Sequence, residues 1–351
     1  MLEQTKIPRD LSIRFANMGF VCACLVVAYH VGVCGVYPYP GWWIRKVFSE
    51  MLGPIAVPYF FLASGFFLSG HISEQGWWRR AISQRVRTLL IPYLIWDFIY
   101  GVFRIVLYVG SNIAAGRPLM DSLPDSLWGW LAYVGLNPAS SPILGPLWFV
   151  RSLMILVVLS PALKWAFEKW RWLFILALYC AYVLVDVFGF VTDAYLRGVL
   201  HRALSLQGFC FFSLGMALRM RPLWVLNGGK KVGLWLFGLV VFLTLYSYYH
   251  AVGGWSVCPH ALFIPLVLLC VWKVMPAHPL NKVLTASSFP MFLLHCFGLE
   301  TFAYSSRFVH LGGPFSTYLI RLVVCIVCPI GISVVLRHLL PRFSQIAFGG
   351  R

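Results

Sequence analysis

The chain has 351 residues and a formal net charge of +17, from 28 Lys and Arg against 11 Asp and Glu, yet only 11% of its residues are charged and 60% are hydrophobic. Soluble domains carry about 25% charged residues. So much apolar side chain needs lipid to cover it, and the composition therefore excludes an ordinary soluble enzyme. The basic residues stand in short clusters between apolar runs, without a recognisable reading module, so nucleic acid is not an expected partner.

The apolar stretches of the chain are long enough to cross a bilayer as helices, since about 20 residues span its hydrocarbon core. We expect spans at residues 17–36, 48–70, 88–109, 144–163, 172–190, 204–219, 232–250, 257–275, 284–303 and 316–336. The predicted fold class is all-α, a polytopic membrane helix bundle of about ten transmembrane helices. It forms a single domain over residues 1–351.

The distribution of Lys and Arg predicts the orientation of this bundle. With the N-terminus in the cytoplasm, the inside segments carry about three times as many Lys and Arg as the outside loops. Both termini are therefore expected in the cytoplasm, and residues 110–143 are expected to form an outer loop. The lipid bilayer is the first partner that the sequence predicts.

Ionisable side chains inside the spans are candidate functional groups, because each costs roughly 2.5 to 3.5 kcal/mol to insert. Helix rise places a set of them at one depth, toward the outer surface: His30, Arg104, Arg151, Glu300 and Arg321. They would form a polar chamber in which His30 is a base, oriented by an acid and surrounded by donors for an oxyanion. In the alternative interpretation the arginines reach toward outer headgroups and Glu300 pairs with one of them.

A second polar layer is expected near the cytoplasmic side. Ser64 and Gly65 interrupt an aromatic run, and the glycine permits close approach of a backbone or a ligand. Arg85 and Arg87 follow on a broad basic face, and Tyr93 opens the next span. This face fits a pocket for phosphates and fits equally a lipid-facing amphipathic helix.

Two further motifs inside the spans can be explained without a functional site. His295 lies in mid-membrane and is either a packed, hydrogen-bonded core histidine or a substrate-site residue. Cys325 and Cys328 have the CxxC spacing but no second pair, so no metal site is expected.

Five fragments in chain order resemble the acyltransferase family 3 of integral-membrane O-acyltransferases. They are Leu25–His30 (LVVAYH), Val57–Phe66 (VPYFFLASGF), Arg85–Tyr93 (RVRTLLIPY), Leu147–Arg151 (LWFVR) and Ser287–His295 (SSFPMFLLH). Gly19 stands where many members have an arginine, and the acidic motif of lipopolysaccharide acetylases is replaced by Leu147–Arg151. The chain is more similar to the branch of fucose-type sugar O-acetylases.

The resemblance implies an acetyltransferase of the bacterial cytoplasmic membrane with acetyl-CoA as cytoplasmic donor. The acceptor would be a hydroxyl of a cell-surface or periplasmic glycan or glycolipid, reached from the outer side. His30 would be the base or acyl carrier, assisted by Glu300. The donor would be held by Ser64, Gly65, Arg85, Arg87 and Tyr93, and the acceptor by Trp148, Arg151, Arg104, His295 and Arg321. The alternative function is a transporter or flippase of a polar or glycolipid substrate, with the outer charges as its binding site.

Overall fold

The structure of the chain is a computed structural model. It describes residues 7–32, 48–49, 52–114, 137–220, 274–305 and 313–350, together with single residues between these ranges. The expected spans at 232–250 and 257–275 lie, but for single residues, outside the described part.

Every regular element of the described part is helical, which confirms the all-α prediction. The α-helices are α1 (Arg9–Gly32), α3 (Ala56–Ser69), α4 (Trp77–Arg85), α5 (Ile91–Ala114), α7 (Trp148–Trp170), α8 (Trp172–Tyr182), α9 (Ala194–Arg202), α10 (Leu206–Met220), α13 (Lys282–Ala286), α14 (Ser288–Ser305), α15 (Pro314–Leu339) and α16 (Pro341–Ala347). Short 3₁₀ or π turns join or precede several of them: η2 (Gly53–Ile55), η3 (Val86–Leu90), η4 (Gly145–Leu147) and η5 (Val183–Val187).

Several of these helices are suited to a bilayer. Within the described residues, 5 are long and apolar enough to cross it: Arg9–Val31, Trp77–Ile113, Gly145–Trp170, Ala194–Met220 and Pro314–Leu339. The shorter apolar helices Gly53–Ser69 and Trp172–Asp186 add to them. The chain is therefore a multi-pass membrane protein. The count of ten spans and the cytoplasmic position of both termini stay predictions.

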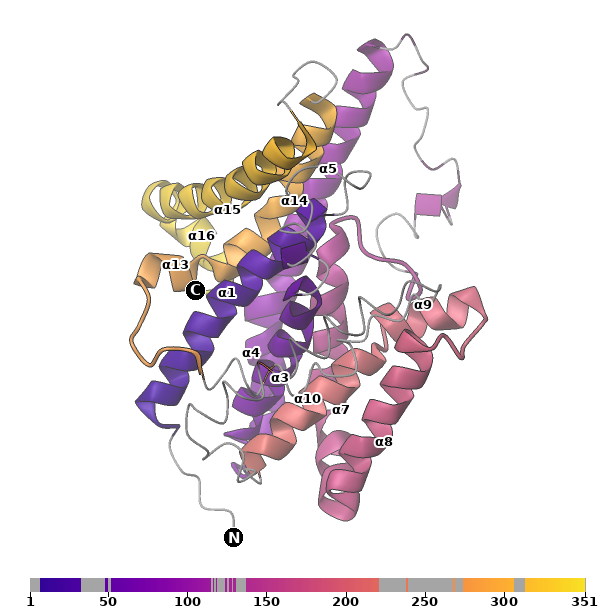
Figure 1. Cartoon of the computed structure of the whole chain (residues 1–351), viewed down its shortest axis with the longest axis vertical. Coiled ribbons are helices and arrows are strands. Elements are labelled where there is room, and N and C mark those ends of the chain that lie inside the picture. The colour runs from indigo at the N-terminus through magenta and orange to yellow at the C-terminus, as the bar shows by residue number, and fades with distance from the viewer. Residues whose placement is uncertain are drawn as a thin grey trace.

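One helix differs from its expected form. We predicted a span at 88–109 preceded by a separate basic segment, but α4, η3 and α5 form one continuous helix, which runs as a long rod through Figure 1. No glycine or proline interrupts the sequence between Trp77 and Ile91, so the helix extends through the basic turns. Pro92 has no N–H to donate, and the π turn η3 lies directly before it, where the Ile91 N–H donates to the carbonyl of Val86.

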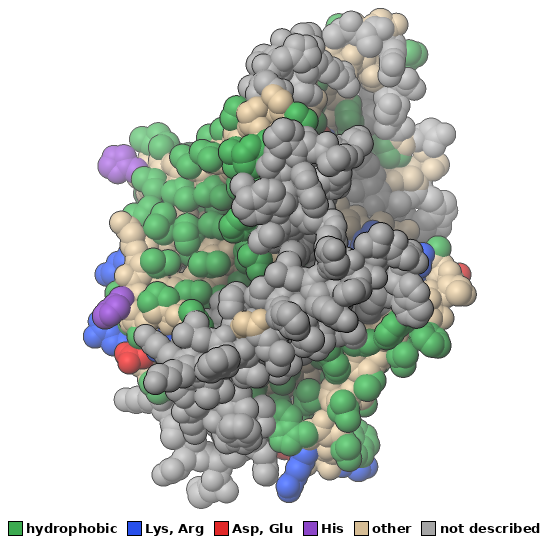
Figure 2. All heavy atoms as spheres, in the orientation of Figure 1, with side chains coloured by type: hydrophobic (Ala, Val, Ile, Leu, Met, Phe, Trp, Pro, Cys, Tyr) green, Lys and Arg blue, Asp and Glu red, His purple; other side chains and the backbone are tan. Residues whose placement is uncertain are grey.

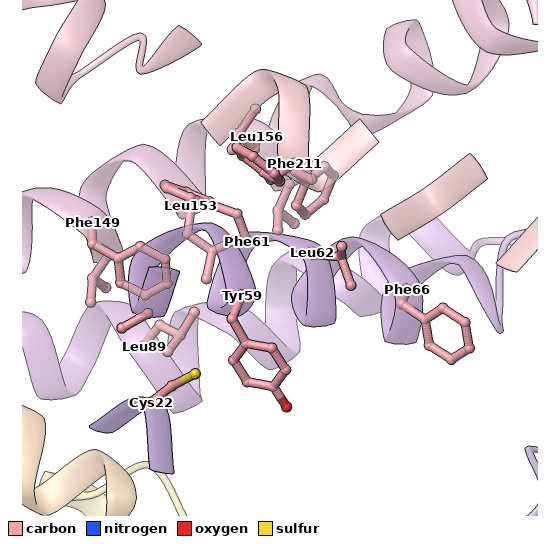
Figure 3. Packing of buried hydrophobic residues seen from close by; sticks show 14 of the residues in the cluster. Cys22, Tyr59, Phe61, Leu62, Phe66, Leu89, Phe149, Leu153, Leu156 and Phe211 are labelled. Carbon is pink, nitrogen blue, oxygen red and sulfur yellow. The ribbon is translucent and has the colours of Figure 1, made fainter. Parts of the chain in front are cut away.

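The centre of the bundle is the crossing of α3 and α10. A Cβ at residue 65 would lie 2.0 Å from the carbonyl oxygen of Phe212, and a Cβ at residue 215 would lie 2.0 Å from that of Leu62. Only Gly65 and Gly215 allow the two backbones to approach this closely. Phe61 and Phe211 pack beside the crossing, and Figure 3 shows how α7 side chains complete this core.

Among the candidate membrane helices of the described residues, α15 is the least buried. Its apolar side chains stay largely exposed, as at Val323, Val327 and Val335. Figure 2 shows hydrophobic side chains gathered over this helix at the upper left of the view. An apolar face of this kind is suited to lipid, in agreement with a membrane location.

The C-terminal helix α16 braces the start of α5. Trp96 donates from its indole nitrogen to the carbonyl of Ala347 at 2.8 Å, and its ring stacks on Phe348 at 5.6 Å. Gly349 has a φ of 65°, and a Cβ there would lie 2.3 Å from the carbonyl oxygen of Thr88. Gly349 therefore packs directly against η3.

Replacing Gly65 with alanine should destabilise the protein by about 1 to 3 kcal/mol or more, since the added methyl group meets a backbone carbonyl that has no space to move. Gly331→Ala is the matched control, because a Cβ at residue 331 of α15 meets nothing within 4 Å. Thermal unfolding in detergent, monitored by tryptophan fluorescence, gives the melting temperature of each variant. Equal melting temperatures for the two variants would show that the crossing tolerates a wider separation.

Candidate functional site

A wide pocket lies at the end of the bundle where α3 ends and α4 begins. Its volume of about 850 Å³ is in the range of small-molecule sites. Its charged side chains are three arginines and one glutamate: Arg80, Arg85, Arg219 and Glu74. Since the basic groups outnumber the acidic one, the pocket is suited to an anion with several charges, such as a chain of phosphates.

A narrow cavity of about 90 Å³ lies between α3, η3, α7 and α14. Four helical segments line it with residues four positions apart, which share one face of a helix. The pairs are Phe60 and Ser64, Arg85 and Leu89, Phe149 and Leu153, and Ser288 and Phe292. The cavity therefore has a hydroxyl and guanidinium end and a phenyl end.

The phenyl end is a layer of three packed rings, from Phe60, Phe149 and Phe292, which we call the phenylalanine layer. The ring of Phe149 lies 6.0 Å from that of Phe60 and 6.0 Å from that of Phe292. The ring of Phe292 lies 6.4 Å from the imidazole of His295, one turn further along α14. The layer thus separates the narrow cavity from a histidine.

Arg85 connects the two hollows, because its side chain lines both the wide pocket and the narrow cavity. It is the last residue of α4, directly before the π turn η3. The wide pocket, Arg85, the Ser64 and Ser288 hydroxyls and the phenylalanine layer therefore follow one another, and we call this series of groups the route. His295 lies directly beyond that layer.

Two histidines meet at the far side of the phenylalanine layer. The rings of His30 and His295 lie 5.0 Å apart, although the residues come from α1 and α14. His295 is fully buried, and His30 is partly exposed. The expected histidine on α1 and the histidine whose role the sequence left open therefore form one pair.

Each imidazole is oriented by its own helix. Nδ1 of His30 lies 2.8 Å from the carbonyl oxygen of Val26, and Nδ1 of His295 lies 3.1 Å from that of Met291. A carbonyl can only accept a hydrogen bond, so Nδ1 carries the proton in both rings and Nε2 carries the lone pair. Nε2 is therefore the atom that can take a proton or attack a carbon.

Glu300 pairs with Arg104, as the alternative interpretation of the sequence predicted. Its Oε1 accepts a hydrogen bond from the Tyr100 hydroxyl at 3.2 Å and lies 3.5 Å from Nε of Arg104. Arg104 also donates to the hydroxyl of Tyr108. Among the described residues, the hydrogen-bond partner that orients His30 is the Val26 carbonyl and not Glu300.

Arg151 holds a loop. Its guanidinium donates to the carbonyl oxygens of Asn137, Pro138 and Ser140 at 3.3, 3.2 and 2.6 Å. Loop residues 137–140 are therefore fixed above the start of α7, where Asp97 also accepts from the backbone N–H of Leu144 at 2.8 Å. A guanidinium has five N–H donors in one plane, so a single side chain can donate to all three carbonyl oxygens.

The other predicted site residues lie apart from the route. Arg87 is exposed and Gly65 faces α10, and neither belongs to the described lining of either hollow. Trp148 stacks on His201 at 5.7 Å, and the guanidinium of Arg321 lies 6.0 Å from the ring of Phe302. Tyr93 interacts electrostatically with Asp97 and Arg151, near the loop that Arg151 holds.

Trp77 and Arg80 belong to the basic segment for which the sequence left a phosphate pocket open, whereas Arg219 and Ser288 were not predicted as site residues. A basic residue at a helix end satisfies the rule for cytoplasmic charge whether or not it faces a pocket, so Arg219 gave no separate signal. Ser288 does have a signal, because it lies seven residues before His295, which is two turns along the same helix face.

Arg151→Lys should loosen the loop at 137–144, because an ammonium group cannot reproduce the planar contacts of the guanidinium. We expect amide hydrogen exchange in that loop to accelerate about 5- to 50-fold, with the rest of α7 unchanged. Arg197→Lys, on the exposed surface of α9, is the control. Unchanged exchange in Arg151→Lys would mean that the loop is held by other contacts.

The fold and the site define a multi-pass membrane protein with a pair of neighbouring histidines inside the bundle and a cationic pocket at one end of it. Comparison with protein families then identifies it: the family model described as an acyltransferase domain matches residues 18–338. The chain therefore belongs to the acyltransferase 3 family, which confirms the resemblance seen in its five fragments.

One curated relative adds detail. The chain is 30% identical over 141 residues to the succinoglycan biosynthesis protein ExoH of Rhizobium meliloti (strain 1021). This match covers 39% of the chain and spans 36% of the relative's length. No solved structure matches the chain.

Proposed function

We propose that this protein is a membrane-bound O-acetyltransferase. It transfers an acetyl group from cytoplasmic acetyl-CoA to a hydroxyl of a cell-surface or periplasmic glycan or glycolipid. The observation that carries the proposal is the arrangement of a cationic pocket and a narrow cavity that share Arg85, with Phe292 of that cavity next to His295 and His295 next to His30. Membership of an acyltransferase family supports the reaction class.

The two hollows fit the two chemically different parts of an acyl-CoA. Arg80, Arg85 and Arg219 can bind its phosphates in the wide pocket, and Trp77 offers an aromatic surface there. The narrow cavity suits a slender chain, and the Ser64 and Ser288 hydroxyls can hydrogen-bond its amides. An acyl-CoA bound in this way supplies a thioester, whose carbonyl carbon is open to attack by an oxygen or nitrogen nucleophile.

His30 supplies the reactive nitrogen. As a base, its Nε2 takes the proton of the acceptor hydroxyl while the hydroxyl oxygen bonds to the acyl carbon, and His30 then returns that proton to the departing thiolate sulfur. As an acyl carrier, the same Nε2 bonds to the acyl carbon while the C–S bond breaks and CoA leaves as the thiolate. The acyl group then passes to the acceptor oxygen while a base takes the hydroxyl proton, which is finally returned to the thiolate. Both routes need the lone pair that the bond from Nδ1 to Val26 leaves on Nε2.

His295 is the second base of this centre. It lies 5.0 Å from His30, and its own Nε2 lies 3.5 Å from the Cys296 thiol, a weak donor. In the carrier route, His295 can take the proton of the acceptor hydroxyl while His30 holds the acyl group. Replacing it should therefore lower turnover and leave donor binding unchanged.

The acceptor and the location follow from topology and from the relative. His30 lies in the last turn of α1, far from the end of the bundle that holds the wide pocket. With the N-terminus in the cytoplasm of a bacterial cell, this depth favours an acceptor from the outer side. The name of the Rhizobium relative refers to the biosynthesis of a glycan, which supports a glycan acceptor.

His30→Ala should lower acetyl transfer by about 10²-fold or more, since it removes the base or carrier, and should leave acetyl-CoA affinity unchanged. Arg85→Gln should raise the Kd for acetyl-CoA by about 10-fold or more, because a charge-assisted contact with phosphate is lost. Calorimetry measures binding, and release of the CoA thiol measures turnover.

Arg87→Gln is the matched control for Arg85→Gln, because it removes the same charge two residues away on an exposed side chain. An equal loss of acetyl-CoA affinity in the two variants would show that the effect comes from general surface charge and not from a specific contact of Arg85. Wild-type rates in His30→Ala would remove His30 from the mechanism. A folded wild-type protein that binds no acetyl-CoA would exclude this donor.

His295→Phe should lower turnover about 10- to 100-fold with the Kd for acetyl-CoA within about 2-fold of wild type. Phenylalanine keeps the shape of the buried ring and removes both nitrogens, so loss of folding is not the expected cause. His278→Phe, in the exposed segment before α13, is the control. Normal turnover in His295→Phe would assign His295 to packing alone.

A further inference from the structure

Glu74 is the acidic side chain among the described residues that line the wide pocket. It lies in the turn between α3 and α4, where Oε2 accepts from Nη2 of Arg80 at 2.6 Å and Oε1 accepts from Nδ1 of His71 at 2.8 Å. The His71 hydrogen bond, with Arg80 nearby, holds the pKa of Glu74 below its usual range. Glu74 is therefore an anion at neutral pH, seated on a guanidinium of the pocket.

The Glu74 carboxylate occupies a binding position on Arg80 that a phosphate can also take. Both groups present two oxygens to a guanidinium, and the face of Arg80 that holds Glu74 cannot hold a phosphate at the same time. The pair is solvent-exposed, with side-chain exposures of 61% for Arg80 and 38% for Glu74. Exposed pairs of this kind are weak, so an incoming phosphate can displace the carboxylate.

We propose that Glu74 is a displaceable latch on Arg80. A phosphate of the donor takes the place of the Glu74 carboxylate when the donor binds, and Glu74 returns to Arg80 when the CoA product leaves. Glu74 thereby limits the affinity of the pocket and favours release of the product. This inference rests on the proposed function, because it assumes that the wide pocket receives the phosphates of an acyl-CoA.

The test compares CoA binding by calorimetry in four proteins: wild type, Glu74→Gln, Arg80→Gln and the double variant. Glu74→Gln should tighten CoA about 2- to 5-fold, since the phosphate then displaces no anion. In the Arg80→Gln background the same substitution should change the Kd by less than about 2-fold, because the latch acts through Arg80. Acetyl-pantetheine, which has no phosphate, should bind equally to wild type and Glu74→Gln.

Glu168→Gln is the matched control. Glu168 is an exposed carboxylate on α7 that lies 3.7 Å from Lys164, so its replacement makes the same change of charge on another ion pair. If Glu74→Gln binds CoA no more tightly than Glu168→Gln, the latch is wrong, and the donor pocket stands as long as Arg80→Gln weakens CoA. If wild type and Arg80→Gln bind CoA equally, the pocket is not the donor site and both proposals fail.

Discussion

The close approach of α3 and α10 is the constraint on which the rest of the site depends. Gly65 and Gly215 let two backbones meet where any side chain would force them apart. On α3, the face that meets α10 and the face that lines the narrow cavity lie roughly opposite each other, since residues advance by about 100°. The depth of Ser64 and Phe60 in the cavity is thus set by a contact on the other side of their helix. In this Ser-Gly pair, Gly65 allows the contact with α10 and Ser64 lines the cavity.

Several residues of the candidate site could be predicted from the sequence, but the contacts between them could not. Depth counting brought His30 to attention, and the basic run after Gly65 pointed to Arg85. The pair of His30 and His295 could not be predicted, because it joins residues 265 positions apart and depth does not specify contact. The role of Arg151 was equally hidden, since its partners are backbone carbonyls, which are the same in every sequence.

Local geometry fixes the chemistry of the histidine pair more firmly than tertiary packing does. In each case the Nδ1 partner is the carbonyl four residues earlier on the same helix, so the tautomer is determined within a single turn. The bundle has only to bring two pre-oriented rings together. Glu300, further along α14 than His295, pairs with Arg104 of α5.

The phenylalanine layer has a consequence for the membrane itself. Under the proposed function a thioester would reach the outer half of the bilayer, and such a passage is a potential leak, because a file of hydrogen-bonded water conducts protons. Three packed phenyl rings offer such a file no hydrogen-bond partner and interrupt it. The same layer can thus preserve the electrochemical gradient on which the cell's energy supply depends.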